Sequence, residues 1–220
     1  MISNLKTHVL SSLGAVRRAS ELCEFASSLK SGDLALCGEL CVSGYERLDR
    51  QFWLDLDENL ANFLKNGAYL GYSCELDGYN EFRLLGSNGL EFKQRKYKLF
   101  KPNGEDKIFK FGNLDEIFIQ EIAGIKVGVL ICFELRFIDL WSRLRGADVI
   151  LVPAMWGQSR REHYETLCKA LALQNRCYTL ACSDVDLKFS AVFAPDGSKA
   201  DVAKFDINLI KKFIKWIDDE

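Results

Sequence analysis

The sequence predicts an α/β layered sandwich in which short buried strands alternate with amphipathic helices. Apolar runs of strand length recur along the chain, and segments with helical spacing of apolar residues lie between them. The middle of the chain adds alternating runs separated by turn residues, a pattern typical of hairpins. With 220 residues, 48% of them hydrophobic, the chain is long enough for one sizeable core, and we expect a single domain over residues 1–220.

Four strands and four helices carry this prediction. The strands are apolar runs rich in Val, Ile and Leu, at Leu34 to Cys37, Lys126 to Cys132, Asp148 to Pro153 and Tyr178 to Ser183. The helices have an apolar stripe along one face, at Gly14 to Leu29, Arg50 to Leu64, Ile138 to Leu144 and Arg161 to Gln174. Because strands and helices alternate, we expect helices to cover the faces of a sheet.

The segment from Ala68 to Ile122 predicts hairpins or meanders within the sheet. Its alternating runs are punctuated at Asp77-Gly78, Ser87-Asn88-Gly89 and Asn103-Gly104. The C-terminal stretch from Asp206 to Asp218 predicts a further helix, with Ile207, Ile210, Ile214 and Ile217 at helical spacing. Such a helix most often docks on its own domain, and a contact with another subunit is the alternative.

Composition favours small-molecule chemistry over binding of nucleic acid or membranes. The formal net charge is −2, and no block of like charges indicates a nucleic-acid or membrane surface. No apolar run reaches the roughly 18 residues of a transmembrane helix, and Met1 to Leu13 lacks the pattern of a signal peptide. We therefore expect a cytoplasmic protein with neither a nucleic-acid nor a membrane partner.

Cysteine and histidine usage argues against a metal centre. The eight cysteines contain no CxxC pair, and there are only two histidines. A zinc ribbon and a disulfide scaffold are both poor interpretations, and we expect no metal and no cofactor. Catalysis would have to rely on Cys, Glu, Asp and Lys.

Cys132 is the candidate nucleophile. The segment from Gly128 to Arg136 reads as a buried strand that ends on Cys132 and then turns polar before the next helix. Ligands in α/β folds gather outside the carboxyl ends of strands, and a sharp turn there exposes a side chain for attack. The alternative is an inert buried thiol, the usual state of a free cysteine.

The segment Cys132-Phe-Glu-Leu-Arg136-Phe resembles the nucleophile box of the nitrilase superfamily of carbon-nitrogen hydrolases, and Gly146 to Ala154 follows at the family's usual interval. Upstream, Leu36 to Tyr45 is similar to the box that carries the family's general base, which implies that role for Glu39. Arg95 to Phe100 resembles the box whose lysine stabilises the tetrahedral intermediate, which implies that role for Lys96.

The resemblance extends over nearly the whole chain. Gly104-Glu105 resembles the segment with a second glutamate near the site, and His163 to Ala170 and Ser190 to Gly197 resemble later parts of the family. It implies an α-β-β-α sandwich that pairs into homodimers or higher homo-oligomers. Both termini look shortened relative to the family, so parts that cover substrate or form the dimer are expected to be reduced.

The function implied by the resemblance is hydrolysis of a small linear amide through a thioester on Cys132. The acid and ammonia or an amine would be released. Glu39 would move the protons, and Lys96 and the Phe133 backbone N–H would hold the oxyanion. Glu105 would position substrate or water, and Trp156 would line the pocket. An N-carbamoyl amide or a nitrile is the alternative substrate.

Several residues depart from the family pattern or stay unassigned. Lys98 stands where histidine is usual, Leu171 where arginine is usual and Gln174 where glutamate is usual. These departures motivate a hypothesis of another class, a non-catalytic binding or scaffold protein. His163 is interpreted as a capping or packing residue. A cationic anchor for a dicarboxylate monoamide would have to come from Arg136, Arg160 or Arg161.

Overall fold

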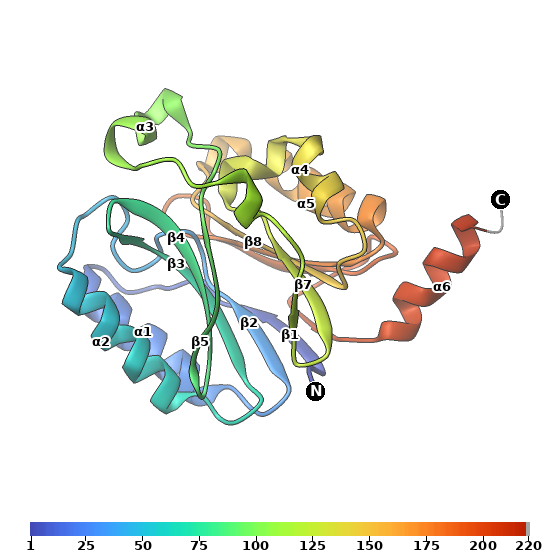
Figure 1. The fold of residues 1–220 in the computed structure, drawn as a ribbon, viewed down its shortest axis with the longest axis horizontal. Coiled ribbons are helices and arrows are strands. Elements are labelled where there is room, and N and C mark those ends of the chain that lie inside the picture. Colours follow the sequence, from blue (N-terminus) through green and yellow to red (C-terminus); the bar gives the residue numbers. More distant parts are fainter. Residues whose placement is uncertain (219–220) are drawn as a thin grey trace.

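In the computed structural model, which describes residues 1–218, two six-stranded sheets lie face to face between two layers of helices (Figure 1). Helices α1 (Ala15–Ser28) and α2 (Arg50–Phe63) cover the first sheet, and α4 (Ile138–Arg143) and α5 (Arg161–Asn175) cover the second. The predicted α-β-β-α sandwich is therefore confirmed. Each helix turns an apolar stripe to its sheet, as the spacing of its apolar residues requires.

Both sheets mix parallel and antiparallel strands. The first contains, from edge to edge, β12 (Val202–Lys204), β1 (Asn4–Thr7), β2 (Asp33–Leu36), β3 (Tyr69–Leu76), β4 (Tyr79–Gly86) and β5 (Gly89–Arg95). The second contains β11 (Lys199–Ala200), β10 (Phe189–Phe193), β9 (Tyr178–Ser183), β8 (Val149–Ala154), β7 (Ile125–Val129) and β6 (Gln120–Ile122). Strands β1 to β3 are parallel, as are β7 to β9. Strand β5 runs with β3 because both are antiparallel to β4.

Strand β2 shows why a central strand reads as one continuous apolar run. Leu34 and Leu36 point between the sheets and belong to the core that both sheets share. Ala35 points the other way and joins the cluster under α1 and α2. Both faces are covered, so successive side chains are buried although they point in opposite directions.

The four predicted strands and four predicted helices are all present, as β2, β7, β8 and β9 and as α1, α2, α4 and α5. The turns at Asp77-Gly78 and at Ser87 to Gly89 join β3, β4 and β5 into a meander, as predicted. The hairpin predicted at Asn103-Gly104 is wrong. There Gly104, with φ of 74°, ends a 3-10 turn and the short helix α3 (Glu105–Ile108) begins.

Helix α6 (Ile207–Asp218) projects away from the two sheets (Figure 1). Ile210 is 3% exposed and packs on the shared core, whereas Ile214, one turn later, is 38% exposed. The predicted docking thus holds for the start of the helix only, and the side chain of Ile217 lies outside the described residues. Within residues 1–218, no helix has the length and apolar character needed to cross a bilayer.

Candidate active site

Glu39 lies just beyond the carboxyl end of β2, where the first sheet meets the second. Its backbone N–H donates to the carbonyl of Ala154 at the end of β8, 3.1 Å away. Gly38 permits this approach, because a Cβ there would lie 2.7 Å from the Cβ of Asp184 and 3.2 Å from the Ala154 oxygen. The Glu39 side chain is thereby held in a buried position between the sheets, 1% exposed.

Lys96 follows β5 and places a fully buried ammonium between two carboxylates. Its Nζ lies 2.7 Å from Glu39 Oε1 and 2.7 and 2.9 Å from the two oxygens of Glu105. Glu105 opens α3 and also accepts the Phe100 backbone N–H at 2.5 Å. The structure therefore brings together three of the four residues predicted to be catalytic, as one buried ionic cluster.

The charges of this cluster do not balance. Burial disfavours the charged form of Lys96, but Glu39, Cys132 and Glu105 together outweigh it and raise the pKa of Lys96 well above its usual value. Burial, followed by the negative charge of Glu39, raises the pKa of Glu105, and Lys96 opposes that rise. One fixed cation is thus shared by two acids, which leaves the cluster with an excess of negative charge when both are ionised.

Cys132 completes the site from the second sheet. The prediction that the strand ends on this residue is wrong, because β7 ends at Val129 and Cys132 begins the 3-10 turn Cys132–Arg136. Its φ is +54°, a left-handed conformation that a non-glycine residue rarely adopts. Burial, followed by the charge of Glu39, raises the pKa of the Cys132 thiol well above its usual value. The resting thiol is therefore protonated at neutral pH.

A cavity of about 100 Å³ opens on the thiol. It is lined by Tyr45, Phe100, Asn103, Glu105, Cys132, Phe133, Arg136, Met155, Trp156, Gly157 and Arg160. Phe133 and Trp156, predicted to bind substrate, both lie in this wall. Of the eight cysteines, all within the described residues, Cys132 alone faces this cavity. The cavity is much smaller than a typical pocket for a drug-sized ligand and suits a small molecule.

Two residues beside the cluster were not assigned from the sequence. Asn80 on β4 donates from its side-chain amide to Glu39 Oε1 at 2.8 Å, and its backbone oxygen accepts the Lys96 N–H at 2.8 Å. Tyr45 points its hydroxyl at Glu105 Oε1, 3.5 Å away. Tyr45 ends the segment from Leu36 that resembles the family's general-base box, which was a signal for it. Asn80 had none, because an isolated asparagine in an alternating strand normally faces solvent.

The remaining candidates lie outside the cavity wall. His163 contacts Arg136 at 3.3 Å, and Arg161 stacks over Phe189 on α5's side of the second sheet. Lys98 lies over the Tyr97 ring, 4.5 Å from its centroid. The other two departures from the family pattern are not in the cavity wall either, since Leu171 is buried in the shared core and Gln174 is exposed on α5.

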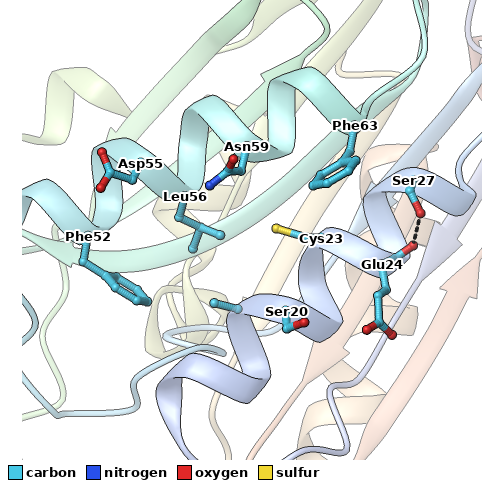
Figure 2. A pocket seen from close by; sticks show the side chains of 10 residues that line it. Ser20, Cys23, Glu24, Ser27, Phe52, Asp55, Leu56, Asn59 and Phe63 are labelled. Atoms are coloured by element: carbon cyan, nitrogen blue, oxygen red, sulfur yellow. Dashed lines mark hydrogen bonds between the residues drawn. The ribbon is translucent and has the colours of Figure 1, made fainter.

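A second hollow lies in the outer helical layer, between α1 and α2 (Figure 2). Its volume is about 490 Å³, and apolar side chains such as Phe52, Leu56 and Phe63 form its walls. It holds Cys23 but none of the residues predicted to be functional. Among residues 1–218, no group of three or more His, Cys, Asp and Glu side chains is arranged to hold a metal ion.

Comparison with curated proteins finds amidases among the relatives. The chain is 28% identical over 169 residues to a protein named 2-oxoglutaramate amidase from Bacillus subtilis, which covers 70% of this chain and 64% of that protein. It is 30% identical over 148 residues to the protein named omega-amidase YafV from Escherichia coli, covering 67% of this chain and 56% of that protein. The chain thus spans less than two thirds of the length of these relatives.

Solved structures and a family model agree on the fold. Saccharomyces cerevisiae Nit3, described as a member of branch 10 of the nitrilase superfamily, superposes with a TM-score of 0.78 at 19% identity, covering 98% of this chain and 94% of that one. An amidase of the nitrilase superfamily from Nesterenkonia superposes with a TM-score of 0.76 at 18% identity, covering 96% and 93%. The family model described as carbon-nitrogen hydrolase matches residues 42–205. The chain therefore belongs to the carbon-nitrogen hydrolase family.

Proposed function

We propose that this protein hydrolyses the C–N bond of a small linear amide through a thioester on Cys132. The observation that carries the proposal is the meeting of a protonated thiol with the buried Glu39, Lys96 and Glu105 cluster at one small cavity. A thiol needs a base to become a strong nucleophile, and the charge of Glu39 already acts on this one. The amidase names of the relatives support the same reaction class.

The first half of the reaction forms the thioester. Cys132 Sγ attacks the carbonyl carbon while its proton passes to Glu39. The oxyanion is stabilised by the Lys96 ammonium and by the Phe133 backbone N–H, which has no hydrogen-bond acceptor among the described residues. The C–N bond then breaks, and Glu39 gives its proton to the leaving nitrogen, which departs as ammonia or an amine.

The second half consumes one water. Glu39 takes a proton from the water as the water oxygen attacks the thioester carbon. The C–S bond breaks, the acid leaves, and the proton returns from Glu39 to the sulfur. Glu105, bound to the same ammonium, keeps Lys96 in place and borders the cavity in which substrate and water must lie. One carboxylate therefore serves both halves, and the second one holds the cation.

We further propose that the substrate carries a carboxylate at the end remote from the amide. Arg136 and Arg160 line the cavity, and their guanidinium carbons lie 4.6 Å and 5.1 Å from the ring centroids of Trp156 and Phe100. Neither guanidinium pairs with a carboxylate of the described residues, so both can bind an anion. The relatives named for 2-oxoglutaramate and for omega-amides fit such a dicarboxylate monoamide.

Release of ammonia from a panel of matched compounds tests both parts. The panel contains a dicarboxylic acid monoamide, the uncharged amide of equal length, an N-carbamoyl compound and a nitrile. We expect turnover of the monoamide, abolished in Cys132→Ala, and a KM raised about tenfold or more in Arg160→Ala for the charged substrate only. Turnover that survives in Cys132→Ala would refute the thioester route. Preference for the uncharged amide would refute the anionic anchor.

We also propose that the protein assembles into homodimers or higher homo-oligomers. The support is that α6 projects from the two sheets, with Ile214 exposed to 38% beyond the first turn (Figure 1). A helix that packs on its own chain only at its start leaves its later turns open to a second copy of the chain. Sedimentation equilibrium of the full chain is expected to give a mass of at least twice the 25.0 kDa of one chain. A single species of monomer mass would contradict this assembly.

A further inference from the structure

We propose that Glu134 is a positioning residue that fixes the nucleophile turn and the lysine segment relative to each other. Its carboxylate reaches across the gap between the two sheets. Oε2 accepts the Ile131 backbone N–H at 2.7 Å, and Oε1 accepts the Tyr97 N–H at 2.6 Å and the Lys98 N–H at 3.3 Å. This inference rests on the proposed function, because it assigns Glu134 to the alignment of that reaction's groups.

The three bonds act on the neighbours of functional residues. Ile131 directly precedes Cys132 after the end of β7 in the second sheet, and Tyr97 directly follows Lys96 after the end of β5 in the first. A carboxylate that accepts from both segments therefore sets the separation of sulfur and ammonium. Capping of the 3-10 turn explains only the bond to Ile131, because a glutamate at this place commonly reaches back to that N–H. The bonds to Tyr97 and Lys98 serve no turn of their own.

Burying the Glu134 carboxylate costs free energy that a residue with only a space-filling role would avoid. The side chain is fully buried, and its carboxylate has no ion-pair partner among residues 1–218. Burial raises its pKa to about 7, even though three backbone donors favour the ionised form. An apolar residue of similar volume would avoid this cost. It could not hold two backbone segments at once.

The Glu134 carboxylate holds the turn at Cys132 in its strained conformation. A residue at φ of +54° persists only where its surroundings hold it, and Ile131 and Glu134 lie on either side of the cysteine. When one link is lost, the turn is free to relax toward an ordinary conformation. A displacement of about 1 Å in a catalytic group can lower the rate by about 100-fold.

The test separates kcat, KM and folding in Glu134→Gln. The glutamine keeps the shape but turns an NH₂ donor toward one of the backbone donors, so one link is lost. We expect kcat to fall about 10- to 100-fold with KM changed by less than about threefold, since the cavity wall stays in place. The matched control is Glu21→Gln, a glutamate on α1 that accepts the Ser11 and Ser12 backbone N–H groups and lines no part of the cavity, and its kcat should equal that of wild type.

A second readout does not depend on turnover. The rate at which iodoacetamide alkylates Cys132 should fall in Glu134→Gln by a factor similar to kcat, while the urea midpoint stays near that of wild type. If wild type hydrolyses no amide of the panel, the proposed function fails, and the alkylation rates still decide the role of Glu134. The inference is overturned if kcat and the alkylation rate in Glu134→Gln stay within about twofold of wild type. It is also overturned if their loss follows a loss of folded protein.

Discussion

Two buried ionic clusters at the first sheet are built from similar charged groups but differ in their surroundings. Around the cavity, Lys96 is shared by Glu39 and Glu105. Under α2, Arg83 is shared by Asp57 and Glu81, with its Nε 2.8 Å from Asp57 Oδ2. Each cluster has one cation between two acids.

The difference lies in charge balance and access. The cluster under α2 has a second cation, because Arg95 reaches Glu81 at 3.4 Å, and the Tyr72 hydroxyl donates to Asp57 at 2.6 Å. Its acids are therefore matched by cations and donors, and it borders no cavity among those described. The cluster at Lys96 keeps a surplus acid beside a protonated thiol. A carboxylate without a cation of its own can take a proton from a nearby nucleophile. A carboxylate neutralised by a cation contributes to stability only.

Glu39→Gln should produce the largest effect. Loss of the general base is expected to lower kcat about 100- to 10,000-fold. The unfolding temperature should stay equal or rise, because one of two acids that compete for Lys96 becomes neutral. Steady-state kinetics and thermal unfolding measure the two quantities. Glu81→Gln is the matched control. Its kcat should equal that of wild type, and its unfolding temperature should be lower. Equal losses of activity in both variants would contradict the assignment of one cluster to catalysis and the other to stability.

Arg83→Met should come next in size. The substitution leaves Asp57 and Glu81 buried without their shared cation, and breaking such a pair costs about 3–5 kcal/mol. Urea unfolding should show this loss, and kcat per folded molecule should remain that of wild type. A loss of less than about 1 kcal/mol would mean that water reaches these acids and that the cluster is not sealed.

Asn80→Ala is expected to have an intermediate effect on the reaction. It removes the amide that donates to Glu39 at 2.8 Å, a hydrogen bond to a charged group. We expect kcat/KM to fall about tenfold, since such a bond contributes about 1.5 kcal/mol or more. The urea midpoint should stay near that of wild type. A kcat/KM within about twofold of wild type would assign Asn80 to packing alone.

Glu21→Gln should have the smallest effect, a small loss of stability, because backbone donors mainly hold this carboxylate. Glu21 accepts the N–H groups of Ser11 and Ser12, each at 2.8 Å. Burial opposes the ionised form, but these bonds outweigh it and lower the pKa of Glu21 to about 2. A lowered pKa stabilises the fold above the unfolded value of 4.5, and that stability is lost as pH falls toward 2. Glu21→Gln should cost less than about 1 kcal/mol at pH 7 in urea unfolding, and the cost should shrink through this window.

The sequence predicted the residues of the site better than their surroundings. Glu39 and Cys132 each follow an apolar strand, so a local pattern and the resemblance to a family both located them. Lys96 follows the largely polar strand β5, and the resemblance alone located it. Their roles stay predictions until kinetics are measured. Asn80 and Arg83 lie on β4, whose alternating polar residues read as a solvent-facing pattern. Only the packing of α2 and the second sheet over that strand buries them, and no local pattern records such long-range packing.

The hairpin predicted at Asn103-Gly104 was wrong for a related reason. Asn103-Gly104 suits a hairpin turn, but glycine with a positive φ suits the end of a 3-10 turn equally well. What decides is the Glu105 carboxylate, which captures the Phe100 N–H and sends the chain into α3. The side-chain partner lies in the structure and cannot be read from the two turn residues.

The division of the site between two sheets has a consequence for how the protein matures. Glu39 and Lys96 come from the first sheet and Cys132 from the second, with residue 132 reached only after more than half of the chain. During synthesis the sulfur therefore has no base beside it until the sheets dock, and an incomplete chain carries an ordinary thiol. The alignment of base and sulfur thus marks the completion of folding, and the appearance of amide turnover, followed in time, would report that final step.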